Sequence, residues 1–294
     1  MTFEYTWTED DLRLMGVHYS GKDTCILMVH GMAGNIIENY FAQVLGDTLS
    51  AAGYGFVYGH NRGYSLMNDI VTKPARTKDN GWKLTRTGVA YELFEDSPKD
   101  IAAWITKVKD LGYKKIILLG HSLGCNKVIH YLHTQQGPDI VGVVLASPPD
   151  MVGLVEREGY QPNYRELTAE AQKLVADGKP RELLSGKLWD WCYISAQTYL
   201  SIFLPSSAAD NLPVLHNPKV FTQLATLQQP ILGIMGEHDD IAIRDLHEDI
   251  ELIKSRAIAC PQFDIAFIEG ADHCYENRED AFASTILDWV RKTA

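Results

Sequence analysis

The stretch KKIILLGHSLGCNKVIHYLHT changes its hydrophobic period halfway, and this change constrains the fold more than any other feature of the chain. Residues 115–119 form a compact apolar run typical of a buried strand, whereas residues 123–133 carry apolar side chains at helical spacing. Ser122 stands between them, flanked by Gly120 and Gly124. A sharp strand-to-helix corner strains the residue at its tip and crowds the positions two residues away, which favours glycine there. The sequence therefore predicts a strand, a tight turn that exposes the Ser122 hydroxyl, and a helix.

Apolar strand patterns alternate with amphipathic helix patterns on both sides of this corner. Strands are expected near residues 3–7, 12–19, 25–30, 55–60, 115–119, 141–147, 231–236 and 263–268, and helices near residues 37–52, 97–112, 123–133, 244–255 and 280–292. Near-continuous apolar strands that alternate with helices are typical of a mostly parallel sheet covered on both faces. We therefore predict an α/β fold.

Two segments interrupt the alternation. Residues 151–228 contain charged helical patterns and the aromatic-rich stretch LWDWCYISAQTYLSIFL, but no convincing strand pattern. We interpret them as a helical cap inserted into a core that consists of residues 1–150 and 229–294. Residues 64–95 show no regular pattern and are too long for an ordinary connection, so we expect them to be functional or disordered.

The composition excludes several classes of partner. The 294-residue chain has a formal net charge of −11, so it offers no basic face to nucleic acid or anionic lipid. No apolar stretch reaches the roughly 18 residues needed to cross a bilayer, and the first residues, MTFEYTWTEDDLR, lack a signal segment. We expect a soluble, cytoplasmic protein. The five cysteines are widely spaced without a CxxC motif, so we expect reduced thiols and neither a disulfide framework nor a zinc site.

A serine hydroxyl needs a base, and the base needs an orienting carboxylate, before it attacks a carbonyl at neutral pH. Asp239 follows directly on the apolar pattern 231–236, at the carboxyl edge of the predicted sheet, and we choose it as the acid. His273 lies after the last strand pattern and is our choice of base. The predicted triad is Ser122, Asp239 and His273, in this order along the chain.

Other residues compete for two of these roles. Glu237 and Asp240 lie beside the chosen acid, and Asp150 follows the strand pattern after the nucleophile helix, so all three remain alternatives. Among the ten histidines, His30 and His121 are disfavoured as the base because neither lies downstream of a candidate acid.

Two backbone N–H groups can stabilise the oxyanion that forms when a serine attacks a carbonyl. One is expected to be the N–H of Leu123, the residue after the nucleophile. The other is expected from the motif HGMAGN at residues 30–35, whose glycines permit a tight turn that directs the Met32 N–H toward the site. An ordinary strand-to-helix turn capped by Asn35 is the alternative.

Aromatic residues of the predicted cap have two interpretations. They can form the wall of a substrate pocket, or they can fasten the cap to the body, as Trp and Tyr at helical spacing commonly do. A capped, partly apolar pocket suits a small or medium acyl or aryl ester better than a polymer. The candidates for the pocket wall are Trp82, Trp189, Trp191, Tyr193 and Tyr199, with Phe203 beside them.

Together, the Gly-His-Ser-Leu-Gly corner, the triad and HGMAGN resemble the α/β-hydrolase superfamily over nearly the whole chain apart from the two interrupting segments. The resemblance implies an eight-stranded, mostly parallel sheet, a catalytic serine and an inserted cap, and it implies no metal or organic cofactor. HGMAGN and ADHCY look most like the bacterial cinnamoyl (feruloyl) esterase-like branch, while the long loop after NRG is similar to a fungal group that contains siderophore esterases. Many relatives carry Asp-x-Arg-Gly-x-Gly-x-Ser where this chain reads HNRGYS at residues 60–65, so the Asp and the second Gly are replaced.

The reaction that the resemblance implies is ester hydrolysis through an acyl-enzyme. Ser122 attacks the carbonyl, His273 takes its proton, Asp239 stabilises the imidazolium, and water repeats the cycle on the acyl-enzyme. We expect a serine carboxylic ester hydrolase that acts on a small-molecule ester. Thioester cleavage, acyl transfer and carbon-carbon bond hydrolysis use the same triad and stay open, as does a ligand-binding homologue without turnover.

Overall fold

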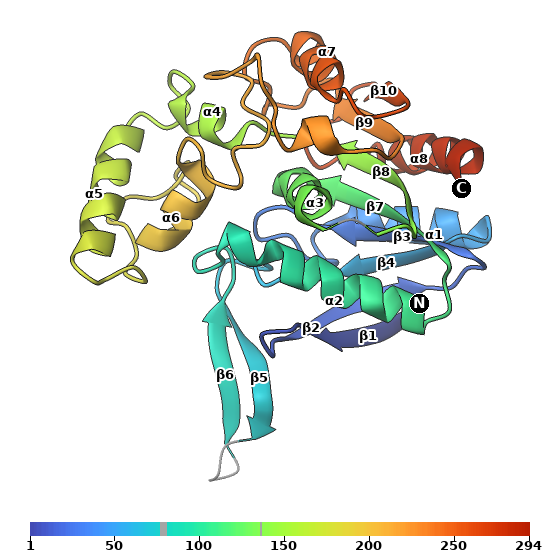
Figure 1. Ribbon diagram of the computed structural model, residues 1–294, viewed down its shortest axis with the longest axis horizontal. Helices are drawn as coiled ribbons and strands as arrows, with labels where there is room; N and C mark the ends of the chain where they lie inside the picture. The colour runs from blue at the N-terminus through green and yellow to red at the C-terminus, as the bar shows by residue number, and fades with distance from the viewer. Residues whose placement is uncertain (77–80, 136) are drawn as a thin grey trace.

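One sheet of eight strands forms the centre of the protein in the computed structural model, which describes residues 1–76, 81–135 and 137–294. The strands are β1 (Thr2–Trp7), β2 (Arg13–Tyr19), β3 (Thr24–Val29), β4 (Gly55–Gly59), β7 (Lys115–His121), β8 (Ile140–Ala146), β9 (Ile231–Gly236) and β10 (Phe263–Ile268). Their order across the sheet is β1-β2-β4-β3-β7-β8-β9-β10 (Figure 1). The strand β2 runs antiparallel to both of its neighbours, β1 and β4. Every other neighbouring pair in the sheet is parallel. The predicted α/β fold with a mostly parallel sheet is confirmed.

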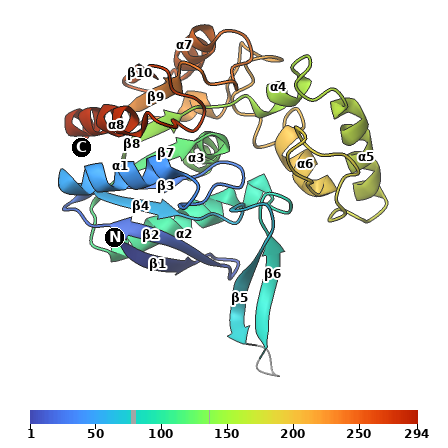
Figure 2. The same ribbon diagram turned by 180° about the vertical axis from the view of Figure 1, so that it is seen from behind.

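Helices cover both faces of the sheet because its strands are apolar on both sides. The helices α1 (Tyr40–Ala51) and α8 (Glu279–Thr293) lie on one face, and α2 (Ser97–Asp110), α3 (Leu123–Thr134) and α7 (Leu246–Arg256) lie on the other (Figures 1 and 2). In β3, Ile26 and Met28 join the buried cluster of α1 and α8, whereas Leu27 joins the cluster of α2 and α3. The strand alternation therefore places successive side chains in two separate cores.

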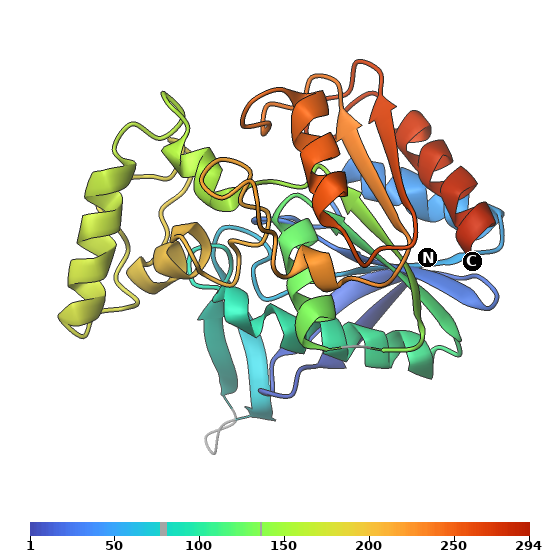
Figure 3. The same cartoon turned by 45° about the horizontal axis from the view of Figure 1, so that its top comes forward.

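The segment after β8 contains the helices α4 (Met151–Glu156), α5 (Tyr164–Ala176) and α6 (Ala196–Phe203) and the short 3-10 helix η2 (Leu224–Thr226). No strand of the eight-stranded sheet lies between β8 and β9, a stretch that the structure describes in full. The helices α5 and α6 extend from one end of the sheet (Figure 3). We keep residues 151–228 as the proposed cap.

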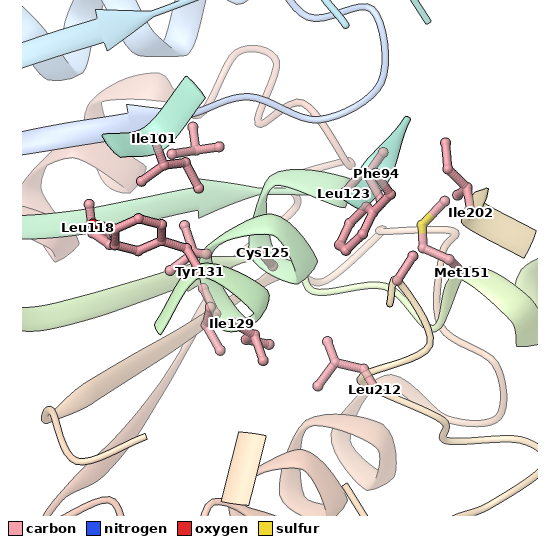
Figure 4. Close-up of a cluster of buried hydrophobic side chains, with 14 of the residues drawn as sticks. Phe94, Ile101, Leu118, Leu123, Cys125, Ile129, Tyr131, Met151, Ile202 and Leu212 are labelled. Carbon is pink, nitrogen blue, oxygen red and sulfur yellow. The ribbon is translucent and has the colours of Figure 1, made fainter. Parts of the chain in front are cut away.

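Buried side chains of the proposed cap continue the core beneath α3. Figure 4 shows Leu123 and Ile129 of α3 in one cluster with Met151 and Ile202, which come from α4 and α6. Burying one such side chain stabilises the folded state by about 1.5–3 kcal/mol. The cap segment is therefore held against the carboxyl edge of the sheet by apolar contacts.

A β-hairpin lies within residues 64–95, where the sequence predicted no regular structure. The strands β5 (Asn68–Arg76) and β6 (Trp82–Thr87) pair antiparallel and extend away from the main sheet, and the 3-10 helix η1 (Phe94–Asp96) follows (Figure 1). Residues 77–80 of this segment lie outside the described residues. The prediction was wrong for β5 and β6 because their side chains are largely polar on both faces, so the hairpin leaves no clear apolar alternation in the sequence.

Local side-chain hydrogen bonds shift two helix boundaries from their predicted places. Asn35 Oδ1 accepts from the N–H groups of Ile37 and Glu38, so this stretch is a turn and α1 begins only at residue 40. Asp245 caps α7 by accepting from two N–H groups of its first turn, so α7 begins at residue 246 and not at 244.

None of the helices in the described part of the chain is long and apolar enough to cross a membrane. All five cysteines are unpaired: Cys25, Cys125 and Cys192 are buried, Cys260 is half-buried and Cys274 is exposed.

Candidate active site

Ser122 occupies the corner between β7 and α3 in a backbone conformation that side chains rarely adopt, with φ of 56° and ψ of −132°. Its N–H donates to the Ala146 carbonyl and its own carbonyl accepts from the Cys125 N–H, so both arms of the corner are held. A Cβ on Gly124 would lie 2.0 Å from the Val29 carbonyl oxygen, and one on Gly120 would lie 2.6 Å from the Cys125 backbone. Close backbone approach therefore explains both glycines.

Gly124→Ala is expected to destabilise the protein by about 3 kcal/mol, since the new Cβ meets backbone that cannot move aside. The higher helix propensity of alanine offsets only about 1 kcal/mol of this. Urea unfolding measures the change, with Gly137→Ala as the control because its Cβ would meet only Ile140 side-chain atoms at 3.7 Å or more. Equal stability of the two variants would contradict the crowding argument.

His273 and Asp239 form the hydrogen-bonded pair that a serine nucleophile requires. The His273 Nδ1–H donates to the Asp239 carboxylate, with distances of 3.0 Å to Oδ1 and 3.2 Å to Oδ2. Asp239 follows β9, and its Oδ1 also accepts from the Ile241 N–H at 3.2 Å. The carboxylate is fully buried, whereas the His273 side chain is 26% exposed. This arrangement fixes the imidazole and leaves its Nε2 free to accept a proton.

Electrostatics within the pair favour a protonated His273 imidazole beside an ionised Asp239 carboxylate. Burial by itself lowers the pKa of His273, but the hydrogen bond and charge of Asp239 outweigh burial and raise it above its ordinary value. Burial by itself raises the pKa of Asp239. The hydrogen bonds from His273 and Ser147 lower this pKa by more than burial raises it, so the net pKa is below the ordinary value. Asp239 is therefore ionised at neutral pH and stabilises a protonated His273.

The competing acids lie in other environments. Glu237 is exposed and accepts from the Gly270 N–H, and Asp240 is exposed at the cavity with its carbonyl bound to Arg157. Asp150 is buried but caps α4 through the Gly153 N–H. Within the described residues, none of these three carboxylates hydrogen-bonds to His273.

The backbone segments expected to supply the two oxyanion N–H groups lie close to Ser122. Leu123 is the first residue of α3, and Met32 lies in the loop after β3, where a Cβ on Gly31 would come within 2.7 Å of the Ser122 Cβ. Among the turn, loop and cap hydrogen bonds of the described residues, neither the Met32 nor the Leu123 N–H has an acceptor. Both groups are therefore available to a ligand oxygen.

Sequence reasoning set His121 aside, but its ring lies against the catalytic candidates. The His121 Nε2 lies 2.9 Å from the His273 carbonyl oxygen, and the two rings have centroids 5.1 Å apart. Burial lowers the pKa of His121 to about 4, so its ring is neutral and its Nε2–H donates to that carbonyl. Its place directly before Ser122 in the elbow motif was the one sequence signal that could have placed it at the site.

Ser147 and Tyr275 also went unnoticed in the sequence. The Ser147 hydroxyl lies 2.8 Å from the Tyr275 hydroxyl, and both side chains are fully buried beside Asp239. Ser147 follows the strand β8, as Asp239 follows β9, and this position at a strand end was the signal that could have found it. Through Ser147, the pair donates a hydrogen bond to the Asp239 carboxylate.

Ser122 and His273 line one cavity of about 300 Å³. Met32 and Cys274 also line the cavity, and Met151, Leu154, Tyr160, Trp189, Trp191 and Ile241 form an apolar wall. Two of the five predicted wall residues, Trp189 and Trp191, are therefore placed at the cavity.

The other three predicted wall residues lie away from it. Tyr199 is buried and its hydroxyl bonds to Thr168 and to the Tyr164 carbonyl, so it fastens α6 to α5. Tyr193 is largely exposed, and Trp82 lies on the hairpin strand β6. Helical spacing alone did not distinguish residues that face the cavity from residues that join helices.

Cys274 lies beside His273 at the cavity, but its chemistry is that of a bystander. Although the side chain reaches solvent, partial desolvation at the cavity and the neighbouring carboxylates raise the pKa of its thiol to about 11. A protonated thiol is a weak nucleophile and a poor redox sensor.

A sequence family matches residues 93–291, which is more than half of the chain, and is described as a protein of unknown function, DUF1749. The chain belongs to the DUF1749 family. The matched residues include Ser122 and the candidate acid and base, Asp239 and His273. No curated protein matches the sequence.

Solved structures with the same fold cover almost the whole chain. Est1E from Butyrivibrio proteoclasticus, solved with ferulic acid bound, is 15% identical with a TM-score of 0.66 and coverage of 99% of this chain and 98% of its own. The Pyrococcus furiosus esterase Pf2001 is 15% identical with a TM-score of 0.62, and the match covers 99% of this chain and 90% of its own. Mouse alpha/beta hydrolase domain-containing protein 10 is 14% identical with a TM-score of 0.63 and 99% coverage of both chains. These similarities confirm the predicted α/β-hydrolase fold.

Proposed function

We propose that this protein is a serine hydrolase that cleaves carboxylic esters of small or medium apolar or aromatic acyl groups. The observation that carries the proposal is the shared cavity of Ser122 and His273, with the His273 Nδ1 3.0 Å from the buried Asp239 carboxylate. A strained, partly exposed serine beside an oriented imidazole is the arrangement that activates a hydroxyl.

The reaction begins when the Ser122 oxygen attacks the ester carbonyl and His273 Nε2 takes the hydroxyl proton. Asp239 stabilises the imidazolium, and the N–H groups of Met32 and Leu123 bind the oxyanion. The imidazolium then gives its proton to the departing alkoxide, which leaves as an alcohol. Water, deprotonated by His273, attacks the acyl-enzyme and restores the serine.

The cavity supports an apolar acyl group of limited size. Its volume of about 300 Å³ lies at the lower end for small-molecule sites, and the side chains of α4 and of Trp189 and Trp191 make one side apolar. Est1E, the structural relative with bound ferulic acid, gives one aryl acyl group to include among the test substrates. The five unpaired cysteines support a reducing, cytoplasmic location.

A substrate panel with active-site labelling tests the proposal. We expect p-nitrophenyl acetate, butyrate and an aryl-acyl ester to be hydrolysed, and a fluorophosphonate probe to modify Ser122 as located by peptide mass spectrometry. Thioesters of the same acyl groups are included because the triad attacks both. Labelling at another residue, or no turnover of any ester or thioester, would contradict the proposal and favour a ligand-binding role.

Trp191→Ala is expected to raise KM for the aryl-acyl ester by about fivefold, because loss of one aromatic contact costs about 1 kcal/mol. The acetyl ester is expected to change less, since its single methyl group offers little surface for an aromatic contact. Trp191 is 44% exposed, so the change leaves the core intact. Trp82→Ala on the hairpin is the matched control, and equal effects of both variants would exclude Trp191 from the acyl site.

A further inference from the structure

Three side chains gather where the proposed cap meets the end of β8. Asp150 lies four residues beyond β8, while Asp210 and His216 come from the segment between α6 and β9. One ligand atom from each, two carboxylate oxygens and one imidazole nitrogen, lie within 4.8 Å of one another. In the described part of the chain, this is the one group of three or more such residues that meets the geometry for holding an ion.

The hydrogen bonds of the cluster leave one acceptor without a partner. Asp150 accepts from the N–H groups of Gly153 and Leu215, and Asp210 Oδ2 accepts from Ser206 and lies 3.1 Å from His216 Nε2. The Asp210 side chain is only 7% exposed, so water does not readily reach it. Its Oδ1 is buried and has no hydrogen-bond partner among the described residues. A buried carboxylate oxygen without a donor is costly, which points to a missing cation or donor.

The charges of the cluster are also unbalanced. Asp150 is 3% exposed and the Asp210 side chain is 7% exposed, so two carboxylates stand close together away from water. Among the described ion pairs, no lysine or arginine contacts either of them, and His216 is the one basic group beside them. Two buried carboxylates with one imidazole carry a charge that a divalent cation would compensate.

We propose that Asp150, Asp210 and His216 form a binding site for a divalent transition-metal ion of the Zn²⁺ type. Zinc accepts carboxylate oxygens and imidazole nitrogens at about 2.0–2.2 Å, whereas Ca²⁺ and Mg²⁺ prefer oxygen ligands alone. His216 is 26% exposed, which gives the ion a path from solvent and lets the ring adjust to a tetrahedral site. Water supplies the fourth ligand.

The ion would act on the structure and not on the bond that Ser122 attacks. Asp150 caps α4, and the α4 residues Met151 and Leu154 line the cavity. Asp210 and His216 belong to the segment that returns from the proposed cap to β9. A metal ion here ties that segment to the start of α4, so its expected effect is to stabilise the cap and the cavity wall.

Zinc binding by protein freed of metal with EDTA tests the site. A Cys274→Ser background removes the thiol beside His273 that would offer zinc a competing site. We expect one Zn²⁺ per chain by isothermal titration calorimetry, a rise in Tm on zinc addition, and visible Co²⁺ absorption bands typical of four ligands. Ca²⁺ and Mg²⁺ are expected to give no comparable rise in Tm.

Asp210→Asn and His216→Ala are expected to weaken zinc binding by roughly 100-fold or more and to abolish the rise in Tm. Loss of a residue that only hydrogen-bonds to a metal ligand typically lowers metal affinity by 10- to 100-fold, and loss of the ligand itself costs more. Asp210→Asn retains an acceptor for Ser206, so its fold is expected to persist, which circular dichroism checks. His133→Ala, an exposed histidine on α3, is the matched control and is expected to bind zinc like the parent. Unchanged zinc affinity in either ligand variant, or absence of zinc binding in the parent, overturns the proposal, and a Ca²⁺ response equal to that of Zn²⁺ overturns the choice of ion.

Discussion

Replacement of Ser122 by alanine is expected to lower kcat on the best p-nitrophenyl ester by about 10⁶-fold, because the covalent step disappears and only the much smaller acceleration from the oxyanion N–H groups and substrate binding remains. The side chain is partly exposed at the corner, so its loss creates no cavity in the core. Stopped-flow and long-time absorbance assays measure the remaining rate, and fluorophosphonate labelling is expected to vanish with it.

Ser255→Ala is the control for Ser122→Ala, since Ser255 is an exposed serine on α7 whose hydroxyl bonds only to the Leu252 carbonyl among the described residues. It is expected to keep full activity. A Ser122→Ala variant with more than about one hundredth of the parent rate would show that the nucleophile lies elsewhere or that water is activated directly.

Asp239→Asn is expected to lower kcat/KM by about 10⁴-fold, because an amide no longer holds the imidazole in its productive tautomer and no longer stabilises the imidazolium. It also changes the pH profile. In the parent, activity requires neutral His273, whose raised pKa places the acid limb of kcat/KM above pH 6.5, and activity falls as the pH drops through that value. Without the charge and hydrogen bond of Asp239, the limb is expected at lower pH.

Asp240→Asn is the matched control for the acid, since this neighbour lines the cavity and its charge also raises the pKa of His273, but with a smaller effect than Asp239. Its loss is expected to shift the acid limb slightly and to reduce kcat/KM by less than about tenfold. A larger loss in Asp240→Asn than in Asp239→Asn would reassign the orienting acid. Rate profiles from pH 5 to pH 9 on both variants measure the difference.

The strand order and the hairpin illustrate different limits of sequence reasoning. The buried strands β3, β7, β8 and β9 are visible because both of their faces are apolar, and their ends mark the positions of Ser122, Ser147 and Asp239. The hairpin β5 and β6 is invisible because polar side chains occupy both of its faces. A pattern predicts a strand only where burial imposes it.

The cap shows why aromatic residues were harder to interpret than the elbow. Trp189 and Tyr199 both belong to an aromatic stretch, but the first lines the cavity and the second joins α6 to α5. Their sequence context is similar because either role requires burial of one ring face. Only the path of the chain between helices decides which surface each ring meets.

The sequence by itself determined the α/β fold and the glycine-flanked corner at Ser122, and it proposed the order of nucleophile, acid and base along the chain, because strand period, helix period and backbone crowding act between near neighbours. The tertiary structure decided which carboxylate meets the His273 Nδ1, which aromatic rings face the cavity, and that Asp150, Asp210 and His216 lie together. Such meetings depend on contacts between residues far apart in the sequence, and these exist only after the chain has closed on itself.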